Sequence, residues 1–89
     1  MAKIRIPTPL QKYTGNQSEI TVDGSTISEI IDNIEKNHNG IKEKLLRDGA
    51  MNKFINVYVD GEDIRFKEGL ATSVGDESEI SIIPAISGG

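Results

Sequence analysis

Hydrophobic and polar positions alternate in two stretches near the start of the chain. The segments KIRI (residues 3–6) and SEITVDG (residues 18–24) both place isoleucine or valine at every other position. A period of two puts alternate side chains on opposite faces of a strand, so each stretch is predicted to be a β-strand with one buried face. Two prolines and a glycine lie in the intervening residues 7–17 and predict a loop. Together the two strands are expected to form a hairpin.

The pattern changes to a period of about 3.6 in residues 26–40. Apolar residues at positions i, i+3, i+4 and i+7 are Ile27, Ile30, Ile31 and Ile34. Thr26 and Glu29 have the form of a capping box, in which each side chain bonds a backbone N–H of the first turn. Asn39-Gly40 predicts the end of the helix, because glycine adopts the left-handed conformation that follows a last turn. A short second helical segment is expected over residues 41–46.

The second half of the chain carries the clearest strand signals. FINVYVDGEDIRF (residues 54–66) contains two alternating runs joined by Asp60-Gly61, a pair that tolerates the positive φ angles of a type I′ turn, and predicts a hairpin. Residues 67–78 have loop composition, and EISIIPA (residues 79–85) predicts a last strand. The expected order is ββαββ with a final β-strand. Since one helix face must be buried against a sheet, the fold class is a two-layer α+β domain.

Some apolar side chains are expected on the outer face of this sheet. The alternating run 55–59 would turn one set of side chains toward the helix and the other set, with the preceding Phe54, toward solvent. On the last strand Ile83 is expected to point outward, with Ile80 and Ile82 divided between the two faces. Exposed apolar groups often mark a partner surface, the alternative being ordinary scattered surface residues. The docking candidates are Phe54, Tyr58 and Ile83.

Composition narrows the possible functions. Eighty-nine residues are enough for one domain and too few for two. The 10 Lys and Arg residues are scattered among 14 Asp and Glu residues, for a net charge of −4. Nucleic acid is therefore not expected as a partner, because its binding requires a basic surface. No stretch has the length and apolar character of a signal peptide or membrane span, so a cytoplasmic protein without membrane contact is expected.

No internal group of residues has the pattern of a catalytic or metal site. The chain contains no cysteine, which excludes a thiolate zinc site and a cysteine nucleophile. Its single histidine, His38, is expected to be a solvated residue near a helix end. Asp60, Glu62 and Asp63 lack the spacing of a calcium loop and are interpreted as a charged hairpin tip. No metal and no bound cofactor are expected.

The sequence ends in IPAISGG, in which a proline follows the last strand and Gly88 and Gly89 are the final residues. With the strand order and the stretch FINVYVDGEDIRFKEGLAT, this ending resembles the ubiquitin-like β-grasp sulfur carriers of the MoaD/ThiS type, and within them the carriers of cysteine biosynthesis. The resemblance covers essentially the whole chain. It implies a β-grasp domain over residues 1–84, with a mixed sheet packed against one main helix, and a flexible tail at residues 85–89.

The resemblance also implies a protein cosubstrate rather than an enzyme. An E1-like enzyme would use ATP and Mg to adenylate the carboxylate of Gly89, and sulfide or a persulfide would displace AMP to leave a thiocarboxylate. Ile86, Ser87 and Gly88 would thread this end into a partner's active site, where glycine permits close approach because it has no Cβ.

The partner that the resemblance implies as sulfur acceptor is a cysteine synthase-like enzyme, with a metalloprotease as a further partner. Two alternatives remain open. The protein could be the small subunit of a molybdopterin synthase, whose large subunit would accept the sulfur. It could also be a ubiquitin-like modifier that is conjugated through Gly89 to lysines of other proteins.

Overall fold

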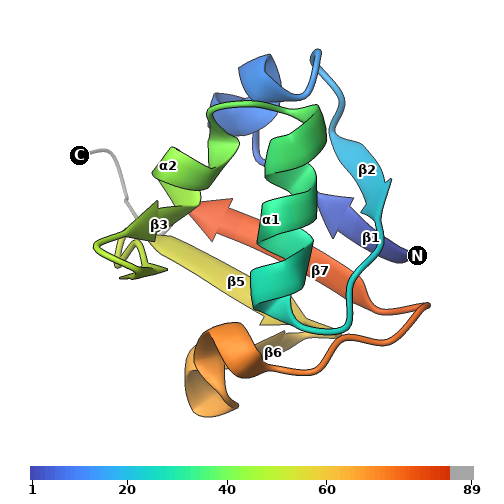
Figure 1. Cartoon of the computed structure of the whole chain (residues 1–89), viewed down its shortest axis with the longest axis vertical. Coiled ribbons are helices and arrows are strands. Elements are labelled where there is room, and N and C mark those ends of the chain that lie inside the picture. Colours follow the sequence, from blue (N-terminus) through green and yellow to red (C-terminus); the bar gives the residue numbers. More distant parts are fainter. Residues whose placement is uncertain (85–89) are drawn as a thin grey trace.

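A five-stranded mixed sheet packs against one main helix in the computed structural model, which describes residues 1–84 (Figure 1). The strands of this sheet are β1 (Ala2–Arg5), β2 (Glu19–Val22), β5 (Ile55–Val59), β6 (Glu62–Asp63) and β7 (Glu79–Pro84). They lie in the order β2-β1-β7-β5-β6. β1 and β7 run parallel, and the other neighbours are antiparallel. The predicted α+β class and the mixed sheet are confirmed.

The first hairpin forms as the alternating pattern predicts. β1 and β2 pair with Ile4 opposite Ile20, and both side chains are buried. The connection between these strands contains a 3-10 helix, η1 (Thr8–Tyr13), which begins after Pro7. Leu10 of this helix is buried in the core. The long loop therefore contributes to the apolar interior.

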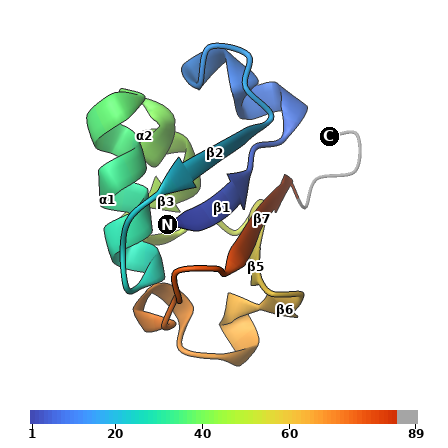
Figure 2. The same cartoon turned by 90° about the vertical axis from the view of Figure 1, so that its right-hand side faces the viewer.

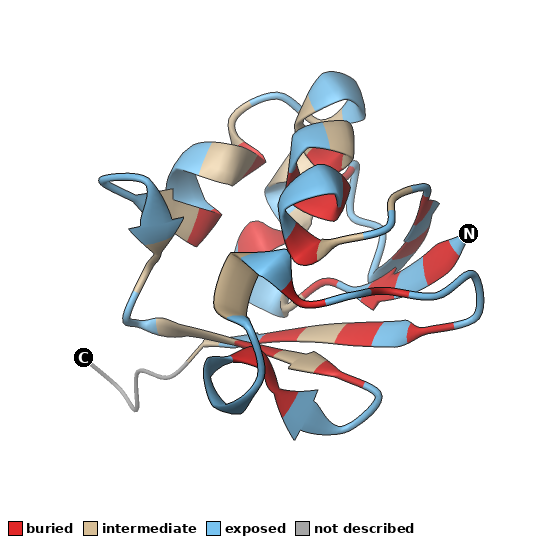
Figure 3. Ribbon diagram, turned by 60° about the horizontal axis from the view of Figure 1, so that its bottom comes forward, coloured by how far each residue is buried: buried red, intermediate tan, exposed pale blue. Residues whose placement is uncertain are grey.

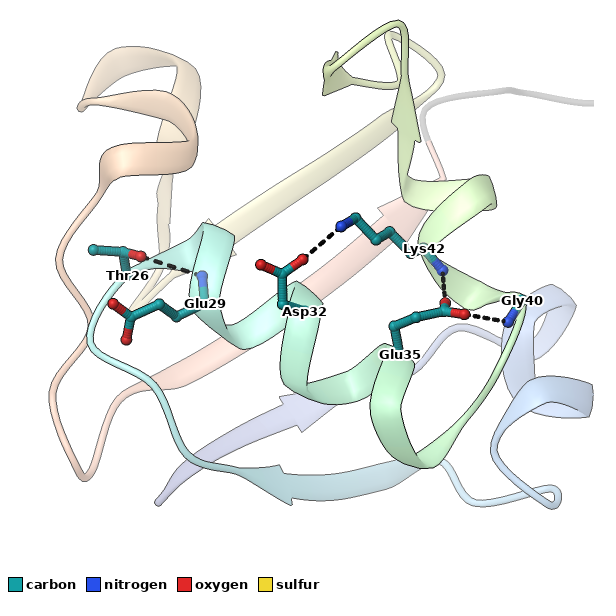
Figure 4. Close-up of polar contacts among 6 residues, drawn as sticks. All are labelled: Thr26, Glu29, Asp32, Glu35, Gly40 and Lys42. Atoms are coloured by element: carbon teal, nitrogen blue, oxygen red, sulfur yellow. Dashed lines mark hydrogen bonds and ion pairs between the residues drawn. The ribbon is translucent and has the colours of Figure 1, made fainter.

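Helix α1 (Ile27–Asn37) begins with a capping arrangement that differs by one residue from the predicted box (Figure 4). The Glu29 N–H donates to Thr26 Oγ1 at 3.2 Å, as expected. The carboxylate of Glu29, however, accepts from the N–H and the hydroxyl of Ser25, each at 2.9 Å, and not from Thr26. These bonds hold the pKa of Glu29 below its ordinary value, the backbone N–H being the main cause.

The predicted end of α1 is wrong in its detail. The helix ends at Asn37, and half-buried His38 is its C-cap, with an N–H that donates to Ile34 O at 2.8 Å. Gly40 has the positive φ of 101° that its sequence context predicts, but it serves as the N-cap of a second helix, α2 (Ile41–Leu45). One glycine therefore permits the turn between two helices.

The carboxylate of Glu35 on α1 forms hydrogen bonds to the start of α2 (Figure 4). Glu35 accepts backbone N–H bonds from Gly40 at 3.0 Å and from Lys42 at 2.9 Å. These two bonds lower the pKa of Glu35, with the Gly40 N–H as the larger cause. Nearby, Lys42 Nζ lies 2.6 Å from Asp32 Oδ1. Glu35 of α1 thus accepts two N–H groups at the start of α2 that have no partner within that helix.

A small hairpin follows α2 that the sequence analysis did not predict. It consists of β3 (Leu46–Arg47) and β4 (Ala50–Met51), joined by Asp48 and Gly49 with φ angles of 54° and 81°. Leu46, expected to be helical, lies in β3. The signal was present in the chain, because Asp48-Gly49 repeats the turn signature that correctly predicted the hairpin at Asp60-Gly61.

The second hairpin is confirmed, but one of its strands is short. Asp60 and Gly61 have φ angles of 50° and 88°, as a type I′ turn requires. Only two pairs join β5 and β6, because the chain turns into a 3-10 helix, η2 (Ile64–Phe66), followed by η3 (Gly69–Ala71). Phe66, expected on a strand, lies on η2 and is 87% exposed.

The core lies between α1 and the sheet and consists largely of isoleucine and valine. All four predicted helix residues, Ile27, Ile30, Ile31 and Ile34, are at most 3% exposed. Figure 3 shows buried and exposed residues alternating along the strands. Ile80 and Ile82 both face the core, so the prediction that they divide between the faces is wrong: residues two apart on a strand share a face. Within residues 1–84, the helices all fall short of the length and apolarity that spanning a membrane would take.

Candidate functional site

The site begins where β7 leaves the sheet. β7 is the central strand, and its last residue, Pro84, lies opposite Ile55 at the start of β5. Proline has no N–H to donate, and the Ile55 N–H, which the register turns away from β7, bonds to Asn52 O at 2.9 Å. The predicted tail residues Ile86, Ser87, Gly88 and Gly89 lie outside the described residues.

Figure 2 shows α1 on one side of β1 and β2, and the exposed side chains of these two strands are polar. Lys3 lies 3.8 Å from Glu19, and Arg5 lies 3.9 Å from Glu79, with all four side chains about half exposed. Exposed ion pairs of this kind contribute little to stability. They give this half of the outer face a mixed charge.

Two of the three predicted docking residues lie beside the end of β7. Ile83 is 46% exposed and precedes Pro84, and Phe54 is 47% exposed and precedes β5. Because β5 and β7 are antiparallel, the start of one strand lies next to the end of the other. The structure thus brings these two apolar side chains to the point where the chain leaves the sheet. Lys53 Nζ lies 5.6 Å from the centre of the Phe54 ring.

Tyr58 is less well placed than the sequence analysis assumed. It is half-buried and lies opposite Ser81, two residues before Ile83 on β7. At about 3.3 Å per residue, that position is roughly 7 Å farther from the exit of the chain.

Asn56 is a residue of this face to which the sequence analysis gave no role. It lies opposite Ile83, and its Oδ1 is buried without a hydrogen-bond partner among the described residues. An unsatisfied buried amide oxygen costs about 1–3 kcal/mol. The signal in the sequence is an asparagine between two aromatic residues of an alternating strand. Because this oxygen is enclosed, it is not a contact point for a docked partner.

Glu62 and Asp63 lie at the hairpin tip, as interpreted, but only Glu62 is solvated. Glu62 is exposed and lies 3.4 Å from Lys67 Nζ. Asp63, by contrast, is 7% exposed, contacts the Arg65 guanidinium at 2.7 Å and accepts the Arg65 N–H at 2.9 Å. These bonds, the side-chain ones first, hold the pKa of Asp63 below its ordinary value. Asp63 caps η2, and reversing its charge would disturb the fold. Over residues 1–84 no cluster of side chains is suited to holding a metal ion.

Comparison with known proteins identifies the family. Residues 4–89 match the ThiS family. The sulfur carrier protein CysO of Mycobacterium tuberculosis is 39% identical, and the match covers 97% of this chain and 96% of that protein. The molybdopterin synthase sulfur carrier subunit of Emericella nidulans is 34% identical over 86% of this chain and 85% of its own length.

Solved structures agree with these relatives. CysO in the Amycolatopsis orientalis BexX/CysO complex superposes with a TM-score of 0.96, at 42% identity over the full length of both chains. Mycobacterium tuberculosis CysO gives a TM-score of 0.93 at 36% identity, covering 97% of this chain and all of that one. The chain is therefore a sulfur carrier with the ubiquitin-like β-grasp fold. It belongs to the ThiS family, as the sequence analysis predicted.

Proposed function

We propose that this protein carries sulfur as a thiocarboxylate on Gly89 and donates it for cysteine biosynthesis in the cytoplasm. The observation that carries the proposal is the 39% identity to CysO over nearly the whole chain. The match of residues 4–89 to the ThiS family supports it. The protein acts as a cosubstrate in this scheme, and a partner enzyme performs the chemistry.

Activation would proceed in two steps on an E1-like enzyme that holds ATP and Mg, an adenylyl transfer to the carboxylate followed by an acyl transfer to sulfide. The carboxylate of Gly89 attacks the α-phosphorus of ATP, and pyrophosphate leaves. Sulfide then attacks the carbonyl carbon of the resulting acyl-adenylate, and AMP leaves with the bonding electron pair. The carrier itself supplies the acyl group, the reach of its tail and a docking surface.

The reach of the tail limits where a docking surface could lie. Five residues span at most about 18 Å, at 3.3–3.6 Å per residue. The sheet must therefore lie close to the entrance of the partner's active site. Phe54 and Ile83 are exposed at this end of the sheet, and they are the anchors that the proposal favours over Tyr58.

A truncated chain tests the reactive end. The full chain and a chain lacking Gly88 and Gly89 are incubated with the E1-like enzyme, ATP, Mg and sulfide, and intact mass is measured. Only the full chain should gain the mass of an oxygen-to-sulfur exchange. The truncation should change the free energy of unfolding by no more than about 0.5 kcal/mol, as is usual for surface changes. A mass gain in the truncated chain, or a large fall in its melting temperature, would argue against Gly89.

Four substitutions test the docking surface. Phe54→Ala and Ile83→Ala should each cost about 1–2 kcal/mol in binding the activating enzyme, which raises KM for the carrier roughly 5- to 30-fold. Tyr58→Ala should have a smaller effect, and Glu62→Lys serves as the control because its side chain is exposed at the opposite end of β5. Each variant must first melt normally. The docking surface is misassigned if Glu62→Lys weakens activation while Phe54→Ala and Ile83→Ala do not.

The similarity to a molybdopterin synthase sulfur carrier subunit favours a second candidate acceptor. The tail chemistry would be the same, and only the receiving enzyme would differ. Thiocarboxylated carrier is mixed separately with a cysteine synthase-like enzyme and with a molybdopterin synthase large subunit, and the two products are assayed. Formation of cysteine supports the main proposal, and formation of molybdopterin alone supports the second.

A modifier function remains the third candidate, because small archaeal modifier protein 3 of Haloferax volcanii is 27% identical over 75% of this chain. Conjugates would appear in cell lysate as a ladder of higher-mass species that contain this protein.

A further inference from the structure

The Lys and Arg side chains that have no ion pair within residues 1–84 lie at one end of the molecule. Five of the ten Lys and Arg side chains form an ion pair with a described carboxylate, and five do not. The five without such a partner are all exposed, and they are Lys12, Lys36, Lys44, Arg47 and Lys53. They are scattered along the sequence, but the fold gathers the elements that carry them.

Two of these cations lie on the elements that follow β1 and complete α1. β1 runs parallel to β7, so η1, which follows β1 and carries Lys12, lies at the end of the sheet where β7 stops. Lys36 is in the last turn of α1. The turn after α1 lies against η1, because a Cβ added to Gly40 would be 3.1 Å from the Tyr13 ring. Figure 1 shows η1 in blue beside the end of α1.

The other three cations lie on the segment between α1 and β5. Lys44 is in α2, Arg47 is in β3 and Lys53 comes shortly before β5. Asn52 connects this segment, because its N–H donates to Leu45 O at 2.9 Å and its side-chain amide donates to Lys44 O at 3.2 Å. β5 begins opposite the end of β7. All five cations therefore lie on elements that meet at the end of the sheet where the chain leaves it.

Lys44 and Arg47 are the two cations best placed to bind a partner. Lys12 and Lys53 lie 5.5 and 5.6 Å from the centres of neighbouring aromatic rings. Lys36 is at the C-terminal end of α1, where a cation interacts favourably with the helix dipole. Lys44 and Arg47 have neither a ring nor a carboxylate partner among the described residues.

This end of the molecule has a net positive charge in a protein that is negative as a whole. The basic end, defined as residues 6–18 and 35–54, holds six basic and three acidic side chains, for a net charge of +3. Of the acidic ones, Glu35 already accepts two backbone N–H bonds, whereas Glu43 and Asp48 are exposed. The net charge of the whole protein is −4.

The negative charge is concentrated at the other end of the sheet. The acidic end, defined as residues 23–29, 60–63 and 72–79, holds eight acidic side chains and no Lys or Arg. These segments follow the end of β2, form the tip of the β5–β6 hairpin and lead into β7. A bridge between Thr26 and Ser73 joins the first segment to the third. Cations elsewhere in the chain form ion pairs with three of the eight carboxylates, so most of the charge is uncompensated.

Such a polarity orients the carrier as it approaches a partner. A protein's summed charge distribution steers association over distances of about 10 Å at 0.1 M salt. A surface rich in Asp and Glu attracts the basic end and repels the acidic end. The apolar side chains of Phe54 and Ile83 are exposed at the same end as the unpaired cations. An apolar centre with a polar rim is the usual composition of a protein interface.

We propose that the basic end binds a surface rich in Asp and Glu on the partner enzyme, beside the active-site entrance that receives Gly89. Lys44 and Arg47 contact these carboxylates, while Phe54 and Ile83 fill an apolar site on the partner. The acidic end faces away from the partner. This docking rests on the proposed function and adds to it the chemical character of the surface that the partner presents.

Peptide probes test the basic end without any enzyme. The ¹⁵N-labelled full chain is titrated with acetyl-Glu-Phe-Glu-Asp-Phe-Glu-amide and, separately, with acetyl-Lys-Phe-Lys-Lys-Phe-Lys-amide. Only the acidic peptide should shift the amides of residues 44–54, and the double variant Lys44→Glu/Arg47→Glu should lose these shifts. No shifts with the acidic peptide, or equal shifts with the lysine peptide, would overturn the proposal. Stronger shifts with single-stranded oligouridine would also overturn it, in favour of a nucleic-acid partner.

Single charge reversals test the same surface during activation by the E1-like enzyme. At about 0.1 M salt, Lys44→Glu and Arg47→Glu should each raise KM for the carrier about three- to tenfold and leave kcat unchanged, because an exposed attraction becomes a repulsion. At about 1 M salt, where the Debye length is about 3 Å, the difference should disappear. Lys67→Glu is the matched control, since it makes the same change in net charge beside Glu62 of the acidic end. Equal effects of all three reversals would show that net charge alone matters.

Failure of this docking can be distinguished from failure of the proposed function. If the parent chain shows no oxygen-to-sulfur exchange by intact mass, the proposed function fails, and the peptide titration still tests the basic end. If the parent is converted but Lys44→Glu and Arg47→Glu behave like Lys67→Glu, sulfur transfer stands and the basic end is not the docking surface. Melting temperatures are measured first. Lys44→Gln and Arg47→Gln, which only remove a charge, replace any reversal that lowers the melting temperature.

Discussion

Ile34→Ala is expected to remove a large part of the stability of this protein. Ile34 is 1% exposed, and the free space in the helix–sheet interface that it lines is only about 10 Å³. Replacing isoleucine with alanine removes three buried carbons, worth about 0.8 kcal/mol each, or about 2.4 kcal/mol together. The cavity left behind adds roughly 24 cal/mol per Å³. The total falls in the range of about 2–5 kcal/mol.

This loss is large compared with the total free energy of unfolding of the protein. At about 0.05–0.15 kcal/mol per residue, a chain of this length has an unfolding free energy of about 4–13 kcal/mol. Each kcal/mol lost lowers the melting temperature of a domain of this size by about 4–8 °C. Ile34→Ala should therefore melt at least about 10 °C below the parent. The same reasoning applies to Ile30, which is also 1% exposed.

Urea unfolding followed by far-UV circular dichroism measures the change, and the chain offers a matched control. Ile83→Ala removes the same three carbons from a side chain that is 46% exposed, so it should cost less than about 1 kcal/mol. The slope of the free energy with urea should be unchanged in both variants. If Ile34→Ala unfolds at the same urea concentration as Ile83→Ala, α1 is not the principal cover of the sheet.

Two further substitutions test local features. Asp63→Asn should destabilise the protein at neutral pH, because Arg65 lowers the folded-state pKa of Asp63. The stabilisation that the Asp63 carboxylate provides is present above its unfolded-state pKa of about 3.9 and is lost as the pH falls through the folded-state pKa. Urea unfolding should show a parent–variant difference that shrinks in acid, and a constant difference would refute this. Gly24→Ala should cost about 1–3 kcal/mol, because at φ 151° its Cβ would lie 2.9 Å from Ile30 Cδ1. Gly75→Ala, whose new Cβ would have its nearest neighbour at 3.6 Å, should melt like the parent; equal melting of both variants would contradict the close packing at Gly24.

Elements that depend on neighbours in the sequence could be predicted from the chain alone. The isoleucine spacing of α1 and the Asp60-Gly61 turn are set by interactions within a few residues, and both were predicted correctly. The hairpin at Asp48-Gly49 carries the same local signal and was overlooked. Family membership, too, could be inferred before the structure, because the strand order and the Gly-Gly ending are features of the sequence.

The remaining features of the fold depend on contacts between residues that are far apart in the sequence. β1 and β7 lie at opposite ends of the chain, and no local pattern indicates that they run side by side. The burial of Asp63 could not be predicted for a similar reason. Its segment alternates like a strand, but after Asp63 the chain turns into η2, where the carboxylate forms an ion pair with Arg65.

The proposed docking surface shows most clearly the division between what the sequence predicts and what the tertiary structure decides. Alternation along the strands correctly predicted that Phe54 and Ile83 are exposed, because strand period alone divides the two faces. It did not predict that they, and not Tyr58, lie beside the end of β7. That follows from the register that places Ile55 opposite Pro84. Register is determined by which apolar side chains can pack together under α1, and packing across a sheet exists only in the folded chain.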